Sequence, residues 1–407
     1  MKTEFARIKR LPPYVFEEVN RLKAAARAAG EDIIDFGMGN PDMETPPHIT
    51  AKLIETAGKP RTNRYSASRG IGGLRRAIAA YYDRRFGVHV DPNTEVVATL
   101  GSKEGFANLA MAITNPGDVV LVPNPSYPIH AYGFIIAGAV IQHLPALDPE
   151  SFLSHLMETA QQCDPPPSAL LINYPSNPTS CTVGLECYRE ALKFAQRFDL
   201  IVLSDLAYSE IYFDGNPPPS FLNLPGAIKR TVEFGSLSKT YAMPGWRVGF
   251  AVGNERLISA LTRIKSDLDY GAFTPIQVAA TAALNGPQDC VDDIRSVYRQ
   301  RRDCLVESMA LAGWDIPPPA ASMFAWAPVP KEFSAAGSMV FSKLLVERAK
   351  VAVSPGIGFG QYGEGFVRIA LVENEQRIRQ AARNVRKFLQ SAESILSDYA
   401  AAQAAAQ

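Results

Sequence analysis

The 407-residue sequence predicts an α/β protein: a large domain with a mostly parallel sheet covered by helices, and a smaller α+β domain. Between residues 95 and 204, short apolar runs of strand length alternate with segments of helix length, which is typical of a parallel sheet with helices on both faces. Polar motifs follow the ends of these runs, where such sheets bind ligands. The chain length and a hydrophobic content of 47% suffice for two domains.

The N-terminal region contains one helix, one short strand and a glycine turn. Apolar residues at helical spacing predict a helix over residues 14–29, which ends at Gly30. A strand is expected over residues 33–37. Gly39 follows it in a GNPD turn, where the absence of a side chain permits close approach of the backbone to a ligand. An ordinary turn is the simpler interpretation of the same four residues.

The middle of the chain supplies the predicted large sheet. A helix over residues 73–86 precedes it, and two further helices over residues 255–284 follow the last strands. The strands and helices alternate in chain order. The expected strands are 96–100, 119–122, 139–144, 169–173 and 200–204, and the expected helices between them are 102–113, 152–161 and 185–198.

The C-terminal region returns the chain to the smaller domain. A long helix over residues 291–312 begins it, and strands are expected over 322–327, 351–353 and 366–371. These elements divide the chain as follows: a small domain from residues 1–50 and 290–398, a large domain from residues 51–289, and a low-complexity, frayed tail over residues 399–407.

The amino-acid composition disfavours nucleic acid, membranes and metal ions as partners of this protein. With 41 basic and 41 acidic side chains, the chain has no net charge to attract nucleic acid or an anionic membrane. We find no apolar run of about 20 residues and no N-terminal leader pattern, so a cytoplasmic location is expected. The five cysteines form no CxxC pair and the five histidines are scattered, so we expect reduced thiols and no metal site.

Lys239 lies between two apolar runs, with Ser236, Ser238 and Thr240 beside it and Arg247 eight residues later. An isolated lysine is usually a surface residue. Here, however, hydroxyls, an ammonium and a guanidinium converge between two strands, which is costly unless an anion or a cofactor satisfies them. Desolvation and a neighbouring cation also lower the pKa of a lysine, which suits Lys239 to imine formation with an aldehyde.

Two nucleotide-binding motifs are disfavoured. The segment around Lys239 resembles a Walker A loop only partly, because Ser238 rather than a glycine precedes the lysine. Glycines at positions 356, 358 and 360 suggest a dinucleotide-binding turn. They lie between two predicted strands, however, whereas that turn joins a strand to a helix.

Two charged residues stand in predicted strands or at their ends. Asp205 directly follows the strand expected over residues 200–204, and a carboxylate there needs a cation or several donors to stay ionised. His130 either hydrogen-bonds Asp205 or is a structural histidine. Arg368, in the apolar strand VRIAL, either grips a carboxylate with two hydrogen bonds or forms an internal salt bridge.

Three further motifs follow predicted strands. Ser102 and Lys103 open a helix, where free backbone N–H groups suit a phosphate; a simple helix cap at Ser102 is the alternative. Prolines flank the loop that holds Tyr127, which suits stacking on a flat heterocycle as well as core packing. Asn177 can donate hydrogen bonds to a ligand or complete a turn.

Ten segments together carry a resemblance to a known family. SLSKT and GWRVGF resemble the lysine signature of class I/II aminotransferases, the fold-type I enzymes that use pyridoxal 5'-phosphate. The other eight resemble the subgroup that contains AlaC-type alanine transaminases and LL-diaminopimelate aminotransferases. They are FGMGNPD, YSASRGIGGLR, GSKEG, PNPSYPIH, YPSNPTS, SDLAY, SPGIGFG and VRIAL, and the resemblance spans residues 6–389.

The resemblance implies roles for particular residues. Lys239, Asp205 and Tyr208 would be catalytic, with Lys239 linked to the cofactor aldehyde and Asp205 paired with its pyridine nitrogen. Tyr65 would reach the cofactor phosphate of the other subunit, which implies a homodimer with shared active sites. The cofactor contacts would be Tyr65, Ser102, Lys103, Tyr127, Asn177, Asp205, Tyr208, Ser236, Lys239 and Arg247, and the substrate contacts Gly39, Asn177 and Arg368.

The implied activity is exchange of an amino group between an L-amino acid and a 2-keto acid. Alanine with 2-oxoglutarate is the expected pair, because the subgroup resemblance is nearest to the AlaC-type enzymes. LL-diaminopimelate transamination is the near alternative, and a C–S β-lyase on the same fold is a more distant one. A regulatory module that senses pyridoxal phosphate is the non-enzymatic alternative, although such proteins usually carry a DNA-binding domain and residues 2–30 contain none.

Overall fold

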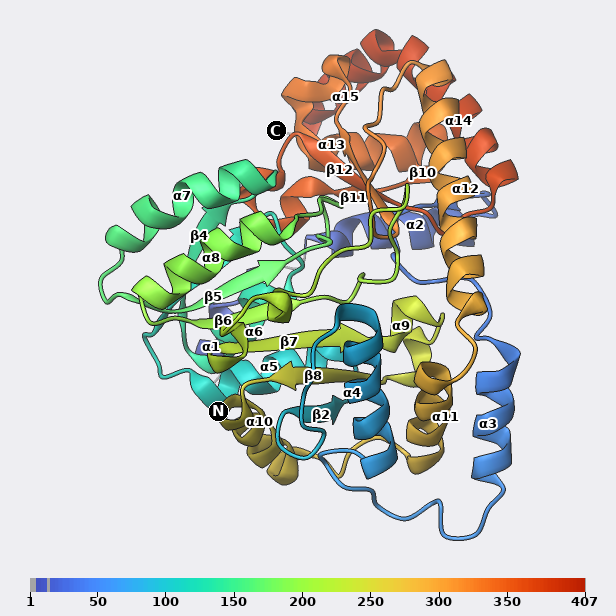
Figure 1. Ribbon diagram of the computed structural model, residues 1–407. Coiled ribbons are helices and arrows are strands. Elements are labelled where there is room, and N and C mark those ends of the chain that lie inside the picture. Colours follow the sequence, from blue (N-terminus) through green and yellow to red (C-terminus); the bar gives the residue numbers. More distant parts are fainter. Residues whose placement is uncertain (1–4, 13–14, 407) are drawn as a thin grey trace.

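The computed structural model describes residues 5–12 and 15–406, and its largest sheet has seven strands (Figure 1). Their order is β2-β8-β7-β6-β5-β3-β4, and only β8 runs antiparallel to its neighbours. The predicted mostly parallel sheet is therefore confirmed. The strands are β2 (Val96–Thr99), β3 (Val119–Asn124), β4 (Val140–Pro145), β5 (Pro167–Asn173), β6 (Ile201–Asp205), β7 (Thr231–Ser236) and β8 (Gly249–Gly253).

Helices cover both faces of this sheet because successive strand residues point to opposite sides. In β5, Leu170 and Ile172 pack against α7 and α8, whereas Ala169 and Leu171 pack in the core with α5, α6 and α10. The helices of the first face are α3 (Pro47–Ala57), α4 (Gly72–Phe86), α7 (Pro149–Gln161), α8 (Leu185–Arg197) and α11 (Thr274–Asn285); those of the second are α5 (Ser102–Ile113), α6 (Ile129–Ala137) and α10 (Glu255–Leu268).

A second group of elements packs above the carboxyl ends of the large sheet (Figure 1). Its core joins Ile34 and Phe36 to buried residues between 294 and 395, and also takes in residues 207–213. The division at residues 50 and 290 stays a proposal, because residues 207–213 belong to the proposed large domain but pack in this core. The elements are α2 (Phe16–Ala28), β1 (Ile34–Asp35), α12 (Asp289–Ala312), β9 (Phe324–Pro328), α13 (Gly337–Leu344), β10 (Val351–Ala352), β11 (Ser354–Pro355), β12 (Phe366–Ala370), α14 (Glu375–Gln390) and α15 (Ala392–Ala406). The short helix α1 (Ala6–Lys9) lies apart from this group, and Arg10 after it donates to the carbonyls of Gly138 and Ala139 before β4 (Figure 1).

The strands of this group form two small sheets. β1 pairs in parallel with β10, and β12 lies between β11 and β9 in an antiparallel sheet. Arg368 lies on the middle strand of the three-stranded sheet, opposite Ser354 of β11 on one side and Trp326 of β9 on the other. The side chain of Arg368 is therefore carried by a strand with a neighbour on each side.

The two ends of the chain differ from the predictions. The predicted start of the first helix, Tyr14, lies outside the described residues, and α2 begins at Phe16. The expected frayed tail after Tyr399 is wrong for the described part, because α15 continues to Ala406. Alanine has the highest helix propensity of the residues, which explains a helix in this alanine-rich segment. In the part of the chain that the structure describes, no helix is long and apolar enough to cross a membrane.

Candidate active site

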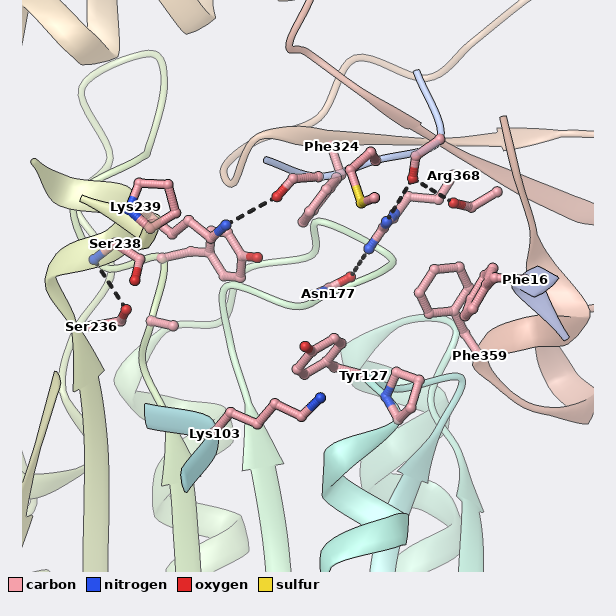
Figure 2. A pocket seen from close by; sticks show the side chains of 18 of the residues that line it. Phe16, Lys103, Tyr127, Asn177, Ser236, Ser238, Lys239, Phe324, Phe359 and Arg368 are labelled. Carbon is pink, nitrogen blue, oxygen red and sulfur yellow. Dashed lines mark hydrogen bonds between the residues drawn. The ribbon is translucent and has the colours of Figure 1, made fainter. Parts of the chain in front are cut away.

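A cavity of about 340 Å³ lies at the carboxyl ends of β3, β5, β6 and β7 (Figure 2). This is the edge at which the predicted motifs were expected to meet. Every site residue predicted from the sequence except Tyr65 lines the cavity. These residues are Gly39, Ser102, Lys103, Tyr127, Asn177, Asp205, Tyr208, Ser236, Lys239, Arg247 and Arg368.

Lys239 lies in a single helical turn, α9 (Leu237–Thr240), directly after β7. The side chain of Ser236 caps this turn by accepting a hydrogen bond from the Ser238 N–H at 3.2 Å. Lys239 Nζ donates to the Gly39 carbonyl at 3.0 Å. Burial, followed by the charges of Arg368 and Arg247, lowers the pKa of Lys239 to about 8.

The lowered pKa gives Lys239 a chemical property that a surface lysine lacks. An ordinary lysine has a pKa near 10.5, so a shift to about 8 raises the neutral fraction of the amine near pH 7 on the order of 10²-fold. Because the neutral amine is both the nucleophile and the base, Lys239 suits attack on an aldehyde and proton transfer.

Asp205 is the last residue of β6, and two neighbouring groups of the protein hold its carboxylate by hydrogen bonds. His130 Nε2 lies 2.8 Å from Asp205 Oδ2, and the Ala207 N–H donates to Oδ1 at 3.1 Å. His130 is fully buried on α6, so the predicted contact between the two residues is confirmed. Among the described residues no lysine or arginine forms an ion pair with Asp205, so its carboxylate can accept a cationic ring nitrogen from the cavity.

The segment before α5 forms a cradle of backbone groups. Gly101 has a φ of 83°, and a Cβ atom there would lie 2.3 Å from Nη2 of Arg247. That guanidinium donates to the Pro244 carbonyl at 2.9 Å and to the Leu100 carbonyl at 3.4 Å. Gly101 is the N-cap and Ser102 the first residue of the helix, so the alternative of Ser102 as the cap is wrong. Free N–H groups at a helix start beside a guanidinium fit a phosphate group.

The ring of Tyr127 lines the cavity, with Lys103 nearby (Figure 2). Lys103 Nζ lies 5.9 Å from the Tyr127 ring centroid, and the ring meets that of His130 edge to face at 5.9 Å. Burial raises the pKa of the Tyr127 hydroxyl and, more strongly, that of Tyr208. Both tyrosines are therefore neutral hydrogen-bond donors near pH 7, and stacking of Tyr127 on a cofactor ring stays a prediction.

Arg368 is held by hydrogen bonds and by two aromatic rings (Figure 2). Its Nη1 donates to Asn177 Oδ1 at 2.8 Å, and its Nη2 donates to the Gly37 carbonyl at 3.3 Å. The guanidinium carbon lies 4.1 Å from the ring centroid of Phe324 and 4.7 Å from that of Phe359. These contacts hold the guanidinium at the cavity, where its parallel N–H groups suit a ligand carboxylate.

The turn that contains Gly39 joins the lysine to the arginine. Its Gly37 carbonyl accepts from Arg368, and its Gly39 carbonyl accepts from Lys239. A Cβ atom at Gly39 would lie only 2.6 Å from the ring of Phe324, so only glycine fits without displacing that ring. The reactive amine and the carboxylate-binding group are thereby held at two ends of one short turn.

Tyr65 does not lie in the cavity of its own chain. Its residue surface is 86% exposed, and its ring packs on Tyr270 with centroids 4.8 Å apart. An exposed aromatic pair of this kind is available to another subunit, so the predicted contact with a partner's cofactor stays a prediction.

The apolar wall of the cavity was not predicted. Phe16 and Val19 reach it from α2, and Phe359 reaches it from the segment between β11 and β12. The rings of Phe16 and Phe359 meet edge to face at 5.1 Å. The only sequence signal was the helical spacing of α2, because packing between distant segments decides which residues of α2 face the cavity.

Comparison with known proteins places this geometry in a family. Residues 31–385 match the model of the aminotransferase class I and II family. The chain is 63% identical over 393 residues to a Rhizobium meliloti (strain 1021) protein provisionally assigned as aminotransferase AatC, with 97% of each chain covered.

Two further relatives carry more specific names. Glutamate-pyruvate aminotransferase AlaC of Escherichia coli (strain K12) is 52% identical over 387 residues, which cover 95% of this chain and 94% of that protein. LL-diaminopimelate aminotransferase of Moorella thermoacetica is 43% identical over 386 residues, which cover 95% and 98%. The substrate-bound structure of BacF from Bacillus subtilis has a TM-score of 0.89 at 34% identity over 95% of this chain and 98% of that one.

The family match, the shared fold and the residues around Lys239 agree with one another. The chain therefore belongs to the class I and II aminotransferases, enzymes that use pyridoxal phosphate to act on amino acids and keto acids.

Proposed function

We propose that this aminotransferase moves the amino group of L-alanine to 2-oxoglutarate, which yields pyruvate and glutamate. The main structural support for transamination in this cavity is the turn that accepts hydrogen bonds from both Lys239 and Arg368. This turn holds a partly neutral amine near a group that can bind a carboxylate. The choice of substrates is supported by the 52% identity to the glutamate-pyruvate aminotransferase AlaC over 95% of the chain.

The side chains that line the cavity would have separate roles in substrate binding and proton transfer. Arg368 would hold the α-carboxylate through two parallel hydrogen bonds, and Asn177, whose oxygen already accepts from Arg368, would donate from its amide nitrogen. Lys239 Nζ would take the proton from the α-carbon of L-alanine and, in the second half of the reaction, would deliver a proton to the α-carbon of 2-oxoglutarate as it becomes glutamate. Asp205 would keep a cationic ring nitrogen protonated, with His130 fixing the carboxylate from behind.

The cofactor residues fit pyridoxal phosphate as a group. When bound, pyridoxal phosphate supplies an aldehyde that links to amino groups and a ring that withdraws electrons from the carbon losing its proton. The cradle at Gly101 and Arg247, with Ser236 and Ser102, would hold its phosphate. Since the amino acid must leave as a keto acid before the second keto acid enters, the kinetics should be ping-pong.

The apolar wall supports a small substrate side chain. Phe16, Val19 and Phe359 present hydrocarbon surface to the cavity, and a methyl group is transferred to such a surface without loss of a hydrogen bond. LL-diaminopimelate, the second candidate, carries an additional charged amino acid group, which needs polar partners. That candidate is favoured by the 43% identity to the Moorella thermoacetica enzyme.

A substrate panel tests the proposal. The purified protein is given L-alanine, LL-diaminopimelate, L-aspartate and L-cysteine separately, each with 2-oxoglutarate, and formation of keto acid and glutamate is followed. We expect kcat/KM for L-alanine to exceed that for LL-diaminopimelate by about 10-fold or more, since the second charged group would lose water where it lies against the hydrocarbon of the apolar wall.

The panel also separates the remaining candidates. The reverse order of the two amino acids would assign the chain to diaminopimelate transamination. Pyruvate and ammonia from cysteine without any glutamate would indicate the C–S β-lyase. Binding of pyridoxal phosphate without turnover of any substrate would support the regulatory module and contradict the proposal.

A mixing experiment tests whether active sites are shared in a homodimer. We expect chains with Tyr65→Ala and chains with Lys239→Ala, assembled into hybrid dimers, to recover about half of the wild-type activity. One site of each hybrid would combine an intact Lys239 with the partner's intact Tyr65. The assay is made at a cofactor concentration that leaves the Tyr65→Ala homodimer largely empty. Activity equal to the mean of the two parent proteins would show that Tyr65 does not act across subunits.

A further inference from the structure

A buried ion cluster lies behind the phosphate cradle, outside the cavity. Lys265, on α10, has a fully buried side chain, and its Nζ lies 3.0 Å from Glu104 Oε1 and 3.0 Å from Asp269 Oδ2. Figure 1 shows α10 beside α5, the helix that carries Glu104. A fully buried ammonium is tolerated only when paired, so these two carboxylates and Lys265 depend on one another.

Glu104 uses its second oxygen to hold the start of the cradle. Its Oε2 accepts a hydrogen bond from the Leu100 N–H at 2.8 Å, and Asn108 also donates to its Oε1. The carbonyl of the same Leu100 accepts from Arg247. The Glu104 carboxylate and the Arg247 guanidinium therefore fix opposite sides of one peptide segment, immediately before Gly101 and the free N–H groups of α5.

The negative charge of Glu104 would repel a bound phosphate, and Lys265 reduces this repulsion. Glu104 lies in the first turn of α5, where its negative charge would repel a phosphate at the start of that helix. The ammonium of Lys265 at 3.0 Å offsets that charge from the side away from the cavity. The carboxylate can then hold the Leu100 N–H without weakening the attraction of the cradle for an anion.

The second carboxylate extends the cluster toward Tyr65. Asp269 Oδ1 accepts from the Gly271 N–H at 2.6 Å, and the Ser68 hydroxyl donates to the Asp269 carbonyl. Tyr270, between these anchored residues, carries the ring on which Tyr65 packs. Lys265 thus connects the chain's own cradle to the segment proposed to serve the partner's phosphate.

We propose that Lys265 is a positioning residue that sets the affinity of the site for the cofactor phosphate, by pairing Glu104 beside the cradle and Asp269 beside Tyr270. The proposal rests on the proposed placement of the phosphate at the start of α5. It does not depend on which amino acid the enzyme uses, so the substrate panel can fail without affecting it.

The test compares two vitamers that differ only in the phosphate. Full-length protein with Lys265→Met is freed of cofactor and titrated with pyridoxal phosphate and with pyridoxal, and the absorbance of the bound form gives each dissociation constant. We expect the constant for pyridoxal phosphate to rise by about 10-fold or more, while that for pyridoxal changes by less than about 3-fold. Lys193→Met, which removes an exposed lysine paired with Glu190 on α8, is the matched control and should change neither.

Two variants of Glu104 separate charge from folding. The double variant Glu104→Gln with Lys265→Met keeps an acceptor for Leu100 but lacks the negative charge, so it should recover most of the affinity for pyridoxal phosphate. Glu104→Gln alone should bind pyridoxal phosphate at least as tightly as the wild type, which gives a result even where Lys265→Met does not fold. Equal losses for both vitamers, or no recovery in the double variant, would overturn the proposal in favour of a purely structural lysine.

Discussion

The Lys239→Ala variant is expected to lose transaminase activity by about 10⁴-fold or more, because one amine would be both the cofactor's covalent partner and the proton carrier. The structure supplies the reason for this double role. Lys239 is partly buried in the cavity wall, and its pKa is lowered to about 8, so a useful fraction of the amine is neutral near pH 7. The measurement is single-turnover conversion of L-alanine by the purified variant, together with the absorbance spectrum after saturation with pyridoxal phosphate.

The same variant can be distinguished from a misfolded protein. Removal of this partly desolvated ammonium should leave the thermal unfolding midpoint unchanged or higher, since desolvation of a charge costs free energy. Added methylamine should restore part of the turnover by carrying the proton in solution, with the effect rising with the concentration of free amine. Full activity of Lys239→Ala without added amine would refute the assignment of this residue.

The Asp205→Asn variant is expected to lower kcat by about 10²- to 10³-fold, because a cationic ring nitrogen would lose its ionised partner in a buried site. Asparagine has nearly the size of aspartate and can still accept from the Ala207 N–H, so the variant removes charge with little change in shape. The measurement is the rate of keto acid formation from L-alanine in a single turnover, with the dissociation constant of pyridoxal phosphate determined in parallel.

Asp214→Asn is the matched control for this change. Asp214 forms a bidentate ion pair with Arg302 at 2.7 and 3.1 Å on the surface, away from the cavity lining. Its φ of 58° is a conformation that asparagine also adopts readily, so this variant should retain wild-type kcat. A wild-type kcat for Asp205→Asn would show that the ring nitrogen does not need an ionised carboxylate.

The strand ends of the large sheet could be predicted from the sequence because the residues that indicate each strand end are neighbours in the chain. A buried strand is a short apolar run, and the polar residue that follows it must face the edge of the sheet. Asp205, Asn177 and Ser102 were located in this way, and each lines the cavity. Gly39 and Arg368 were also singled out from their local sequence, but only the resemblance to a family brought them to the same site, because they come from the two ends of the chain and the neighbouring strands belong to the smaller sheets.

Other features depend on contacts between distant segments. Both faces of β8 are buried, so its residues carry no alternation that reveals its direction or its place between β2 and β7. Phe359 lines the cavity because its segment packs on α2. Lys265 acts on the phosphate cradle through Glu104, which lies 161 positions earlier in the chain. The tail was misjudged for a different reason: low sequence complexity was taken as disorder, although repeated alanines favour a helix.

The apolar wall and the catalytic groups come from different parts of the fold, so the substrate specificity can change separately from the chemistry. Phe16 and Val19 belong to α2 and Phe359 to a loop of the smaller sheets, whereas Lys239 and Asp205 stand on the seven-stranded sheet. Mutations that reshape the wall therefore alter which side chain is accepted without disturbing the groups that perform the chemistry. Libraries confined to these three wall positions offer a direct route to redesigned selectivity on an unchanged reaction core.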